Sequence, residues 1–124
     1  MAGLTLDTGA LFALERRRQR IRQIVTIASR DAVRMTVPAA VVAEWWRGRS
    51  AVAEDILAAF ELEVLDESLS KLAGEALAAI PSATTIDAIV MASAARRGDV
   101  VLTSDVDDLT ALQRHFRSVR VLGV

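Results

Sequence analysis

Four carboxylates stand where the pattern of apolar residues predicts that strands end or helices begin: Asp7, Glu44, Asp87 and Asp105. Asp7 and Asp105 each follow a short apolar run, which is typical of a buried parallel strand. Because the carboxyl ends of parallel strands meet at one edge of an open α/β sheet, we expect these side chains to converge there. Carboxylate oxygens suit hard cations, so the set predicts a site for Mg²⁺, with Mn²⁺ as the alternative ion.

A shared cation would remove the cost of bringing such carboxylates together. Two carboxylates about 4 Å apart repel by roughly 1 kcal/mol in water and by about 4 kcal/mol at an effective dielectric constant near 20. Bound Mg²⁺ turns that repulsion into affinity for the ion. It can also polarise a phosphodiester oxygen and lower the pKa of a bound water, which is the chemistry of metal-assisted hydrolysis.

Each carboxylate, taken alone, also fits an ordinary structural role. An acid in the first turn of a helix, as expected for Asp87, gains about 0.3 to 1 kcal/mol from the partial positive charge there. Asp7 fits a turn, and residues 104–108 fit an N-cap followed by acidic first-turn residues. Glu44 fits a solvated helix face. The four together, at the expected strand and helix ends, favour a site.

The composition leaves carboxylates as the main available chemistry. The 124 residues include no cysteine, which excludes disulfides and thiolate zinc sites, and a single histidine, His115, which disfavours a Ser/His/Asp triad. A net charge of −1 gives no overall attraction to nucleic acid, although five arginines gather in residues 16–22. No stretch approaches the roughly 20 apolar residues of a membrane span, so we expect a cytoplasmic protein without membrane contact.

Apolar periodicity predicts the elements that would position the acids. Strands are expected at residues 4–6, 34–37, 62–65, 100–103 and 119–122, and helices at 18–29, 38–47, 51–60, 69–80, 85–97 and 107–116. We expect Thr85 to cap the helix that carries Asp87, and Gly98 to end it. The alternation predicts one α/β domain over residues 1–124, with a mostly parallel five-stranded sheet flanked by helices on both faces.

Four ordered segments carry a family resemblance: residues 6–11, 43–44, 85–88 and 102–109. They resemble the signatures of PIN domains, especially the VapC-type ribonuclease toxins of bacterial type II toxin–antitoxin systems. The resemblance implies a PIN-like three-layer sandwich and a Mg²⁺-dependent endoribonuclease. It also implies RNA as the substrate, neutralisation by a cognate VapB-type antitoxin, and a homodimer.

Carried over by position, the resemblance assigns roles to individual residues. Asp7, Asp87 and Asp105 would ligate the metal directly, and Glu44 would act through a water molecule or help to deprotonate it. The remaining candidates are a weaker fifth acid and four side chains that would orient the substrate: Asp108, Thr103, Ser104, Arg47 and Arg96.

Two further features have both a functional and a structural interpretation. Arg16 and Arg20, like Arg18 and Arg22, are spaced as like-charged neighbours on one helix, where each pair costs about 0.2 to 0.5 kcal/mol. They fit a phosphate-tracking or antitoxin-facing surface, or simply a solvated face. The pair Trp45-Trp46 is not part of the family pattern. We expect the first tryptophan in the core and the second partly exposed, where it could stack on a base, anchor a partner or lie in a dimer interface.

Two other functions stay open at the level of sequence. A receiver-like phosphoacceptor also gathers acids around Mg²⁺, and Asp66 after the third strand could accept the phosphoryl group. Such a module wants a lysine after its last strand, whereas the only lysine here is Lys71. The second is a catalytically silent PIN fold that serves binding or dimerisation; the presence of all four acids argues weakly against it.

Overall fold

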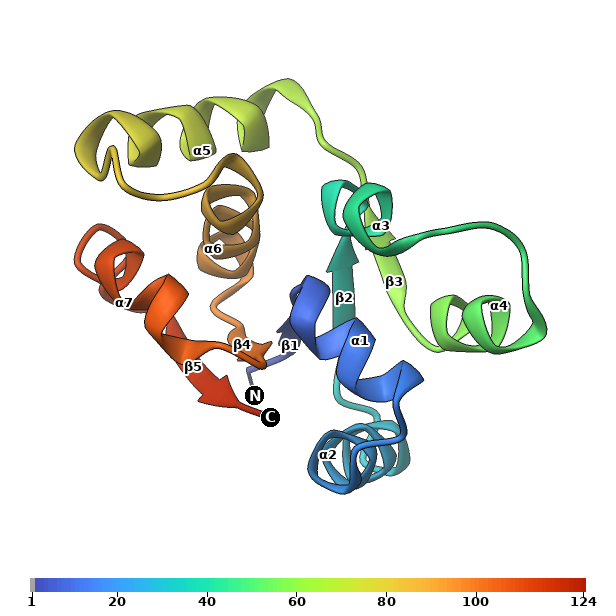
Figure 1. Cartoon of the computed structure of the whole chain (residues 1–124). Helices are drawn as coiled ribbons and strands as arrows, with labels where there is room; N and C mark the ends of the chain where they lie inside the picture. Colours follow the sequence, from blue (N-terminus) through green and yellow to red (C-terminus); the bar gives the residue numbers. More distant parts are fainter. Residues whose placement is uncertain (1) are drawn as a thin grey trace.

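The computed structural model describes residues 2–124, which form one parallel sheet with helices on both faces (Figure 1). The strands are β1 (Leu4–Leu6), β2 (Met35–Pro38), β3 (Glu61–Glu63), β4 (Val100–Thr103) and β5 (Arg120–Gly123). The helices are α1 (Thr8–Glu15), α2 (Gln19–Arg30), α3 (Ala39–Trp45), α4 (Ala51–Ala58), α5 (Glu67–Ala79), α6 (Thr85–Arg97) and α7 (Val106–Gln113). The predicted fold class is confirmed, and all strand pairs are parallel.

The order of the strands explains how the helices divide into two layers. The sheet runs β3-β2-β1-β4-β5, so the chain moves outward from β1 to β2 and β3 and then returns to β4 on the other side of β1. Right-handed crossovers then place the helices of the two halves on opposite faces. In Figure 1, α1 to α4 lie on one side of the strands, and α5 to α7 lie on the other. Helix α6 is buried from Ala88 to Ala94, as its apolar sequence predicts.

The reversal of strand order falls between β1 and β4. At such a point the connections leave the two strands in opposite directions, and a crevice forms outside their carboxyl ends. Leu6 pairs with Leu102 in the register of these strands. The residues that follow them, Asp7 and the turn 104–105, therefore lie at the same edge of the sheet.

Helix α1 was not predicted. The sequence suggested a turn after β1 and a first helix at residues 18–29, whereas α1 begins directly after Asp7. Its eight residues are almost all apolar or small, and Ala10, Leu11 and Ala13 are buried. A helix without a polar face lacks the contrast on which the 3.6-residue period depends.

The true boundary between α1 and α2 also corrects the interpretation of the arginines. α1 ends at Glu15 and α2 begins at Gln19, with Arg17 in a left-handed conformation at φ 56°. Arg16 is therefore the C-cap residue of α1, whereas Arg20 lies in the first turn of α2, so these two are not neighbours within one helix. Arg18 is the N-cap residue of α2, one turn before Arg22, and its side chain makes no capping hydrogen bond.

The remaining boundaries shift by a few residues. Thr84, rather than Thr85, caps α6, and Gly98 ends it at φ 72°, as predicted. The third strand is earlier than expected, because Val64 and Leu65 lie beyond β3 and are exposed. Within residues 2–124, no helix has both the length and the apolar character needed to cross a lipid bilayer.

Candidate metal and nuclease site

Asp7 is a buried carboxylate at the carboxyl end of β1. It is the N-cap of α1, where its Oδ1 accepts a hydrogen bond from the backbone N–H of Ala10 at 2.8 Å. Only 8% of the residue is exposed. The capping role is therefore real, but most N-caps lie at the surface, and burial of this one requires a further explanation.

The environment of Asp7 opposes its negative charge. Its pKa is raised from 3.8 to about 6, chiefly by burial and to a smaller extent by the negative charges of Asp87 and Glu44. Hydrogen bonds from the Thr103 side chain and the Ala10 N–H act in the opposite direction and lower this pKa. Three elements that are distant in sequence thus bring carboxylates within electrostatic range of one another.

Asp87 occupies the first turn of α6 and faces the same group of acids. Its pKa is raised by burial, opposed by a hydrogen bond with Thr84, and raised further by Asp108, Glu44 and Asp105. The Thr84 hydroxyl caps the helix by accepting from the Asp87 N–H at 3.2 Å. The Asp87 carboxylate therefore has no capping task.

Glu44 and Asp105 are both exposed, but they are held differently. The Thr8 hydroxyl donates to Glu44 Oε1 at 2.5 Å and so ties α3 to the first turn of α1. Asp105 is the N-cap residue of α7, but its side chain makes no capping hydrogen bond. Instead the Asp105 N–H donates to the Thr103 hydroxyl at 3.0 Å. The Asp105 carboxylate is left free at the edge of the site, close to Asp108 in the same helix.

Ser104 packs against Gly9, the second residue of α1. A Cβ added to Gly9 would lie 2.1 Å from Ser104 Oγ, so this position tolerates no side chain without movement of the turn. The sequence indicated Gly9 only as a turn former and did not single out Thr8. Their contacts, with Ser104 and Glu44 respectively, became visible only once α1 was placed.

Neither of the two arginines predicted to orient the substrate, Arg96 and Arg47, is held against the acids. Arg96 lies in the last turn of α6, about 13 Å along the helix from Asp87 at a rise of about 1.5 Å per residue, and it pairs with Glu63 at 3.3 Å and Asp66 at 3.4 Å. It is therefore not brought to the acids. Arg47 is exposed after α3 and donates to the Trp46 carbonyl at 2.9 Å. A hollow of about 470 Å³ that includes Ser104 is instead lined by Arg16, Arg18 and Arg20.

The donor set suits a hard divalent cation, although it does not yet enclose one. All the candidate ligands are oxygens, and the mutual repulsion of Asp7, Asp87 and Glu44 is the cost that a cation would relieve. Within residues 2–124, no three acidic, histidine or cysteine side chains converge closely enough to bind one ion as they stand. Binding would have to draw the exposed acids inward.

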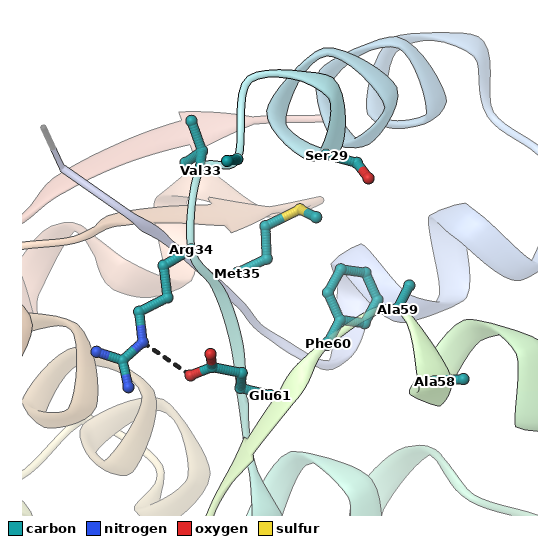
Figure 2. A pocket seen from close by; sticks show the side chains of 9 residues that line it. Ser29, Val33, Arg34, Met35, Ala58, Ala59, Phe60 and Glu61 are labelled. Atoms are coloured by element: carbon teal, nitrogen blue, oxygen red, sulfur yellow. Dashed lines mark hydrogen bonds and ion pairs between the residues drawn. The ribbon is translucent and has the colours of Figure 1, made fainter.

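A larger hollow lies elsewhere. It measures about 650 Å³ and opens at the amino ends of β2 and β3. Figure 2 shows Met35 and Phe60 at this hollow, beside an Arg34–Glu61 ion pair of 2.7 Å. None of the candidate site residues lines it. Size alone would therefore have pointed to the wrong end of the sheet.

The receiver-like alternative is overturned by the role of Asp66 together with the family match below. Asp66 is the N-cap of α5, where its Oδ1 accepts from the Leu69 N–H at 2.8 Å, and it also pairs with Arg96. It belongs to the neighbourhood of α5 and the end of α6, whereas the clustered acids gather at the start of α6.

Comparison with known proteins identifies the fold. Residues 4–114 match the family model described as PIN domain, while no curated protein matches the sequence. A solved structure of DNA-bound VapBC from Salmonella typhimurium has a TM-score of 0.76 at 20% identity, covering 99% of this chain and 98% of the other.

Two further solved structures are similar. A toxin–antitoxin complex from Klebsiella pneumoniae has a TM-score of 0.72 at 13% identity, covering 98% and 100% of the two chains. FitAB bound to a DNA fragment has a TM-score of 0.65 at 19% identity, covering 97% and 94%. At these identities the likeness shows the fold alone. PIN domains are generally nucleases, and the match over residues 4–114 shows that this chain belongs to the PIN domain family.

Proposed function

We propose that this chain is a divalent-metal-dependent endoribonuclease, and that it is the toxin of a toxin–antitoxin pair. The observation that carries the proposal is a buried carboxylate, Asp7, whose pKa is raised to about 6 beside two other acids at the reversal point of a PIN-domain sheet. Such perturbed groups are concentrated at functional sites.

In this proposal the acids hold Mg²⁺ or Mn²⁺ between the starts of α1 and α6. Asp7, Asp87 and Asp105 are the direct ligands, with Asp108 as a weaker fifth member of the group, and Glu44 ligates through water or accepts its proton. When bound, the ion supplies charge neutralisation at the phosphodiester and a water of lowered pKa.

Two residues at the end of β4, Thr103 and Ser104, lie beside the acids. Thr103 contacts both the Asp7 carboxylate and the turn that leads to Asp105. Ser104 is pressed against Gly9, within reach of a phosphate at the edge of the site. We assign the exposed Ser104 hydroxyl to orienting the substrate, as the sequence predicts. Thr103 is 1% exposed, so its hydroxyl positions Asp7 and the turn instead of touching the substrate.

The RNA backbone is proposed to follow the arginine-lined hollow beside Ser104. Arg16, Arg18 and Arg20 face this hollow, and guanidinium groups bind phosphate oxygens in bidentate geometry. Such contacts position a nucleic acid without reading its sequence. In this proposal Arg16, Arg18 and Arg20 bind the substrate in place of Arg96.

The proposed partner is a VapB-type antitoxin, and the proposed assembly is a homodimer. Support comes from the similar structures, whose titles describe VapBC, a toxin–antitoxin complex and FitAB. Co-expression with the neighbouring gene product, followed by size-exclusion chromatography with light scattering, tests both points. A chain that stays monomeric and binds no such product would contradict them.

The central test compares Asp87→Asn with Asp107→Asn. Both remove one charge from an acid in the first turn of a helix, but only Asp87 interacts with the other acids. We expect Asp87→Asn to abolish growth arrest and to slow metal-dependent cleavage of single-stranded RNA at least 100-fold, roughly the size of loss produced by removing one transition-state contact. Asp107→Asn should act like the native chain. Full cleavage by Asp87→Asn at normal expression would refute the proposal.

The catalytically silent PIN fold remains the second candidate, because the exposed acids do not yet converge on one point. Titration calorimetry with Mg²⁺ and Mn²⁺ separates the two. Heat of binding that disappears in Asp87→Asn supports the nuclease, whereas absence of binding by the native chain supports the silent fold.

A further inference from the structure

A second hollow shares Phe12 with the arginine-lined one and lies between α1 and the connection from α3 to α4. It measures about 320 Å³, and its walls include Phe12, Trp45, Trp46 and Arg47. We infer that this hollow is a nucleobase subsite, which takes an unpaired base of the RNA adjacent to the bond that is cut. The inference rests on the proposed function and gives it a substrate class, single-stranded RNA.

The aromatic side chains form a fixed platform. Trp45 is 3% exposed and belongs to the core, and the half-buried Trp46 packs edge-on against it, with ring centroids 6.1 Å apart at 67°. Across the hollow, Phe12 projects from α1 with the Arg16 guanidinium carbon 5.5 Å from its ring centroid. Aromatic faces of this kind stack on bases without sequence preference, and a cation over a ring strengthens such a platform.

The charge around the hollow suits a polyanion. Two arginines, Arg47 and Arg49, and one acid, Glu15, line the hollow. Arg49 pairs with Glu54 at 2.7 Å, whereas Arg47 forms no ion pair with the acids of residues 2–124. Arg47 therefore remains available for a phosphate next to a bound base.

The two helices that line the hollow, α1 and α3, also carry residues of the acid site. Glu44 directly precedes Trp45 on α3, and Phe12 lies one turn beyond Thr8, whose hydroxyl binds Glu44. Figure 1 shows α1, α3 and α4 gathered on this side of the sheet. A base seated here would leave its own phosphodiester near the acids. The base must be unpaired, because pairing hides its faces in the helical stack.

The test measures tryptophan fluorescence during a titration with RNA. The chain has two tryptophans and no tyrosine, so its intrinsic fluorescence reports on this hollow alone. The full chain with Asp87→Asn, which cannot cleave in this scheme, is titrated with a short single-stranded RNA of mixed sequence. A chain of the same length whose riboses carry no bases is the comparison probe. We expect the first to quench fluorescence and the second to leave it unchanged.

Substitutions then assign the effect. In the same background Trp46→Leu should weaken RNA affinity about 5- to 150-fold, the range of one stacked base, while Trp46→Phe should retain most of it. Trp45→Phe leaves Trp46 as the sole fluorophore and should keep the quenching, because the stacking ring in this scheme is that of Trp46. Leu62→Ala, which trims an exposed apolar side chain on the distant β3, should change nothing.

The outcomes separate this inference from the proposed function. RNA affinity that is equal in the parent, Trp46→Leu and Trp46→Phe proteins overturns the subsite and leaves the nuclease intact. Equal quenching by the base-free chain also overturns it, because only the backbone would then be bound. Absence of RNA binding by every variant overturns both proposals. Quenching by the purified antitoxin, with none by RNA, reassigns the hollow to a protein partner and overturns the inference.

Discussion

The molecule buries carboxylates in two places and treats them in opposite ways. Beneath the end of α6, Asp99 pairs with Arg97 at 2.9 Å and accepts from the Thr5 hydroxyl at 2.8 Å, while Arg97 also bonds Glu63. At the reversal point of the sheet, Asp7 is buried among other acids with no cation paired to it. The first region is complete in that a cation faces its carboxylates, although Glu63 Oε1 is buried without a partner within residues 2–124. The second region is incomplete, because no cation faces Asp7 there. In the proposed function this lost stability is the cost of metal binding.

Removing the cation from the complete region should have the largest effect on stability. Arg97→Met leaves Asp99 and Glu63 without their shared partner; the Arg97 side chain is 13% exposed and that of Asp99 2%. Breaking a buried pair from one side costs about 3 to 5 kcal/mol. Urea denaturation should show that loss in the free energy of unfolding. The neighbouring Arg96→Met, which removes the more exposed pairs to Glu63 and Asp66, should cost about 1 kcal/mol or less. Equal effects of the two variants would contradict the contrast.

Removing a charge from the incomplete region should act in the opposite direction. Asp7→Asn keeps the capping oxygen but removes a carboxylate whose pKa is raised from 3.8 to about 6. The ionised form above pH 6 therefore costs the folded state about 3 kcal/mol, at 1.36 kcal/mol per pKa unit. We expect the variant to be more stable than the metal-free native chain at pH 7.5, although it should lose cleavage activity. Destabilisation at that pH would break the comparison.

The same shift predicts a pH dependence with a defined sign. Since the folded pKa of Asp7 lies above its unfolded value, its contribution favours folding below about pH 4 and is lost as pH rises through about 6. Urea midpoints measured between pH 4 and 7 should show this component in the native chain but not in Asp7→Asn. Saturating Mg²⁺ should offset it at pH 7, because a cation favours the ionised carboxylate.

Much of the difference between the two regions could not be predicted from the sequence, because it depends on which strands are neighbours in the sheet. The strands and most helices were predictable, since β-branched runs and helical periodicity are local signals. The acid cluster followed from a general rule about strand ends. The Arg97 network did not, because its partners come from β1, β3 and the residue before β4. Arg96 was misplaced for a different reason: helical rise alone separates it from Asp87, and that arithmetic was available from the sequence.

Two glycine substitutions, one beside the acids and one in α5, should change the stability by an intermediate amount. Gly9→Ala would set a Cβ 2.1 Å from Ser104 Oγ, 3.1 Å from Ser104 Cβ and 3.3 Å from its backbone nitrogen, so the hydroxyl must rotate and the turn after β4 must shift slightly. Overpacking of this kind costs about 1 to 3 kcal/mol, and we expect RNA cleavage to fall with it. Gly74→Ala in α5 meets nothing within 4 Å and should stabilise the chain by about 0.5 to 1 kcal/mol. Thermal unfolding and a cleavage assay on both variants test the difference; full activity of Gly9→Ala would show that the position of Ser104 is unimportant.

The smallest effect on stability is expected at Asp105, and its comparison with the N-cap residue Asp66 most directly separates structural acids from proposed metal ligands. Asp66 uses its carboxylate to cap α5, so Asp66→Ala should cost about 0.5 to 2 kcal/mol. Asp105 occupies the same position before α7 but makes no such bond. Asp105→Ala should therefore leave the urea midpoint of the metal-free chain within error, and should weaken Mg²⁺ binding in calorimetry. If the two substitutions were equally destabilising and left metal binding unchanged, Asp105 would be an ordinary cap, and the incomplete region would lose one of its proposed ligands.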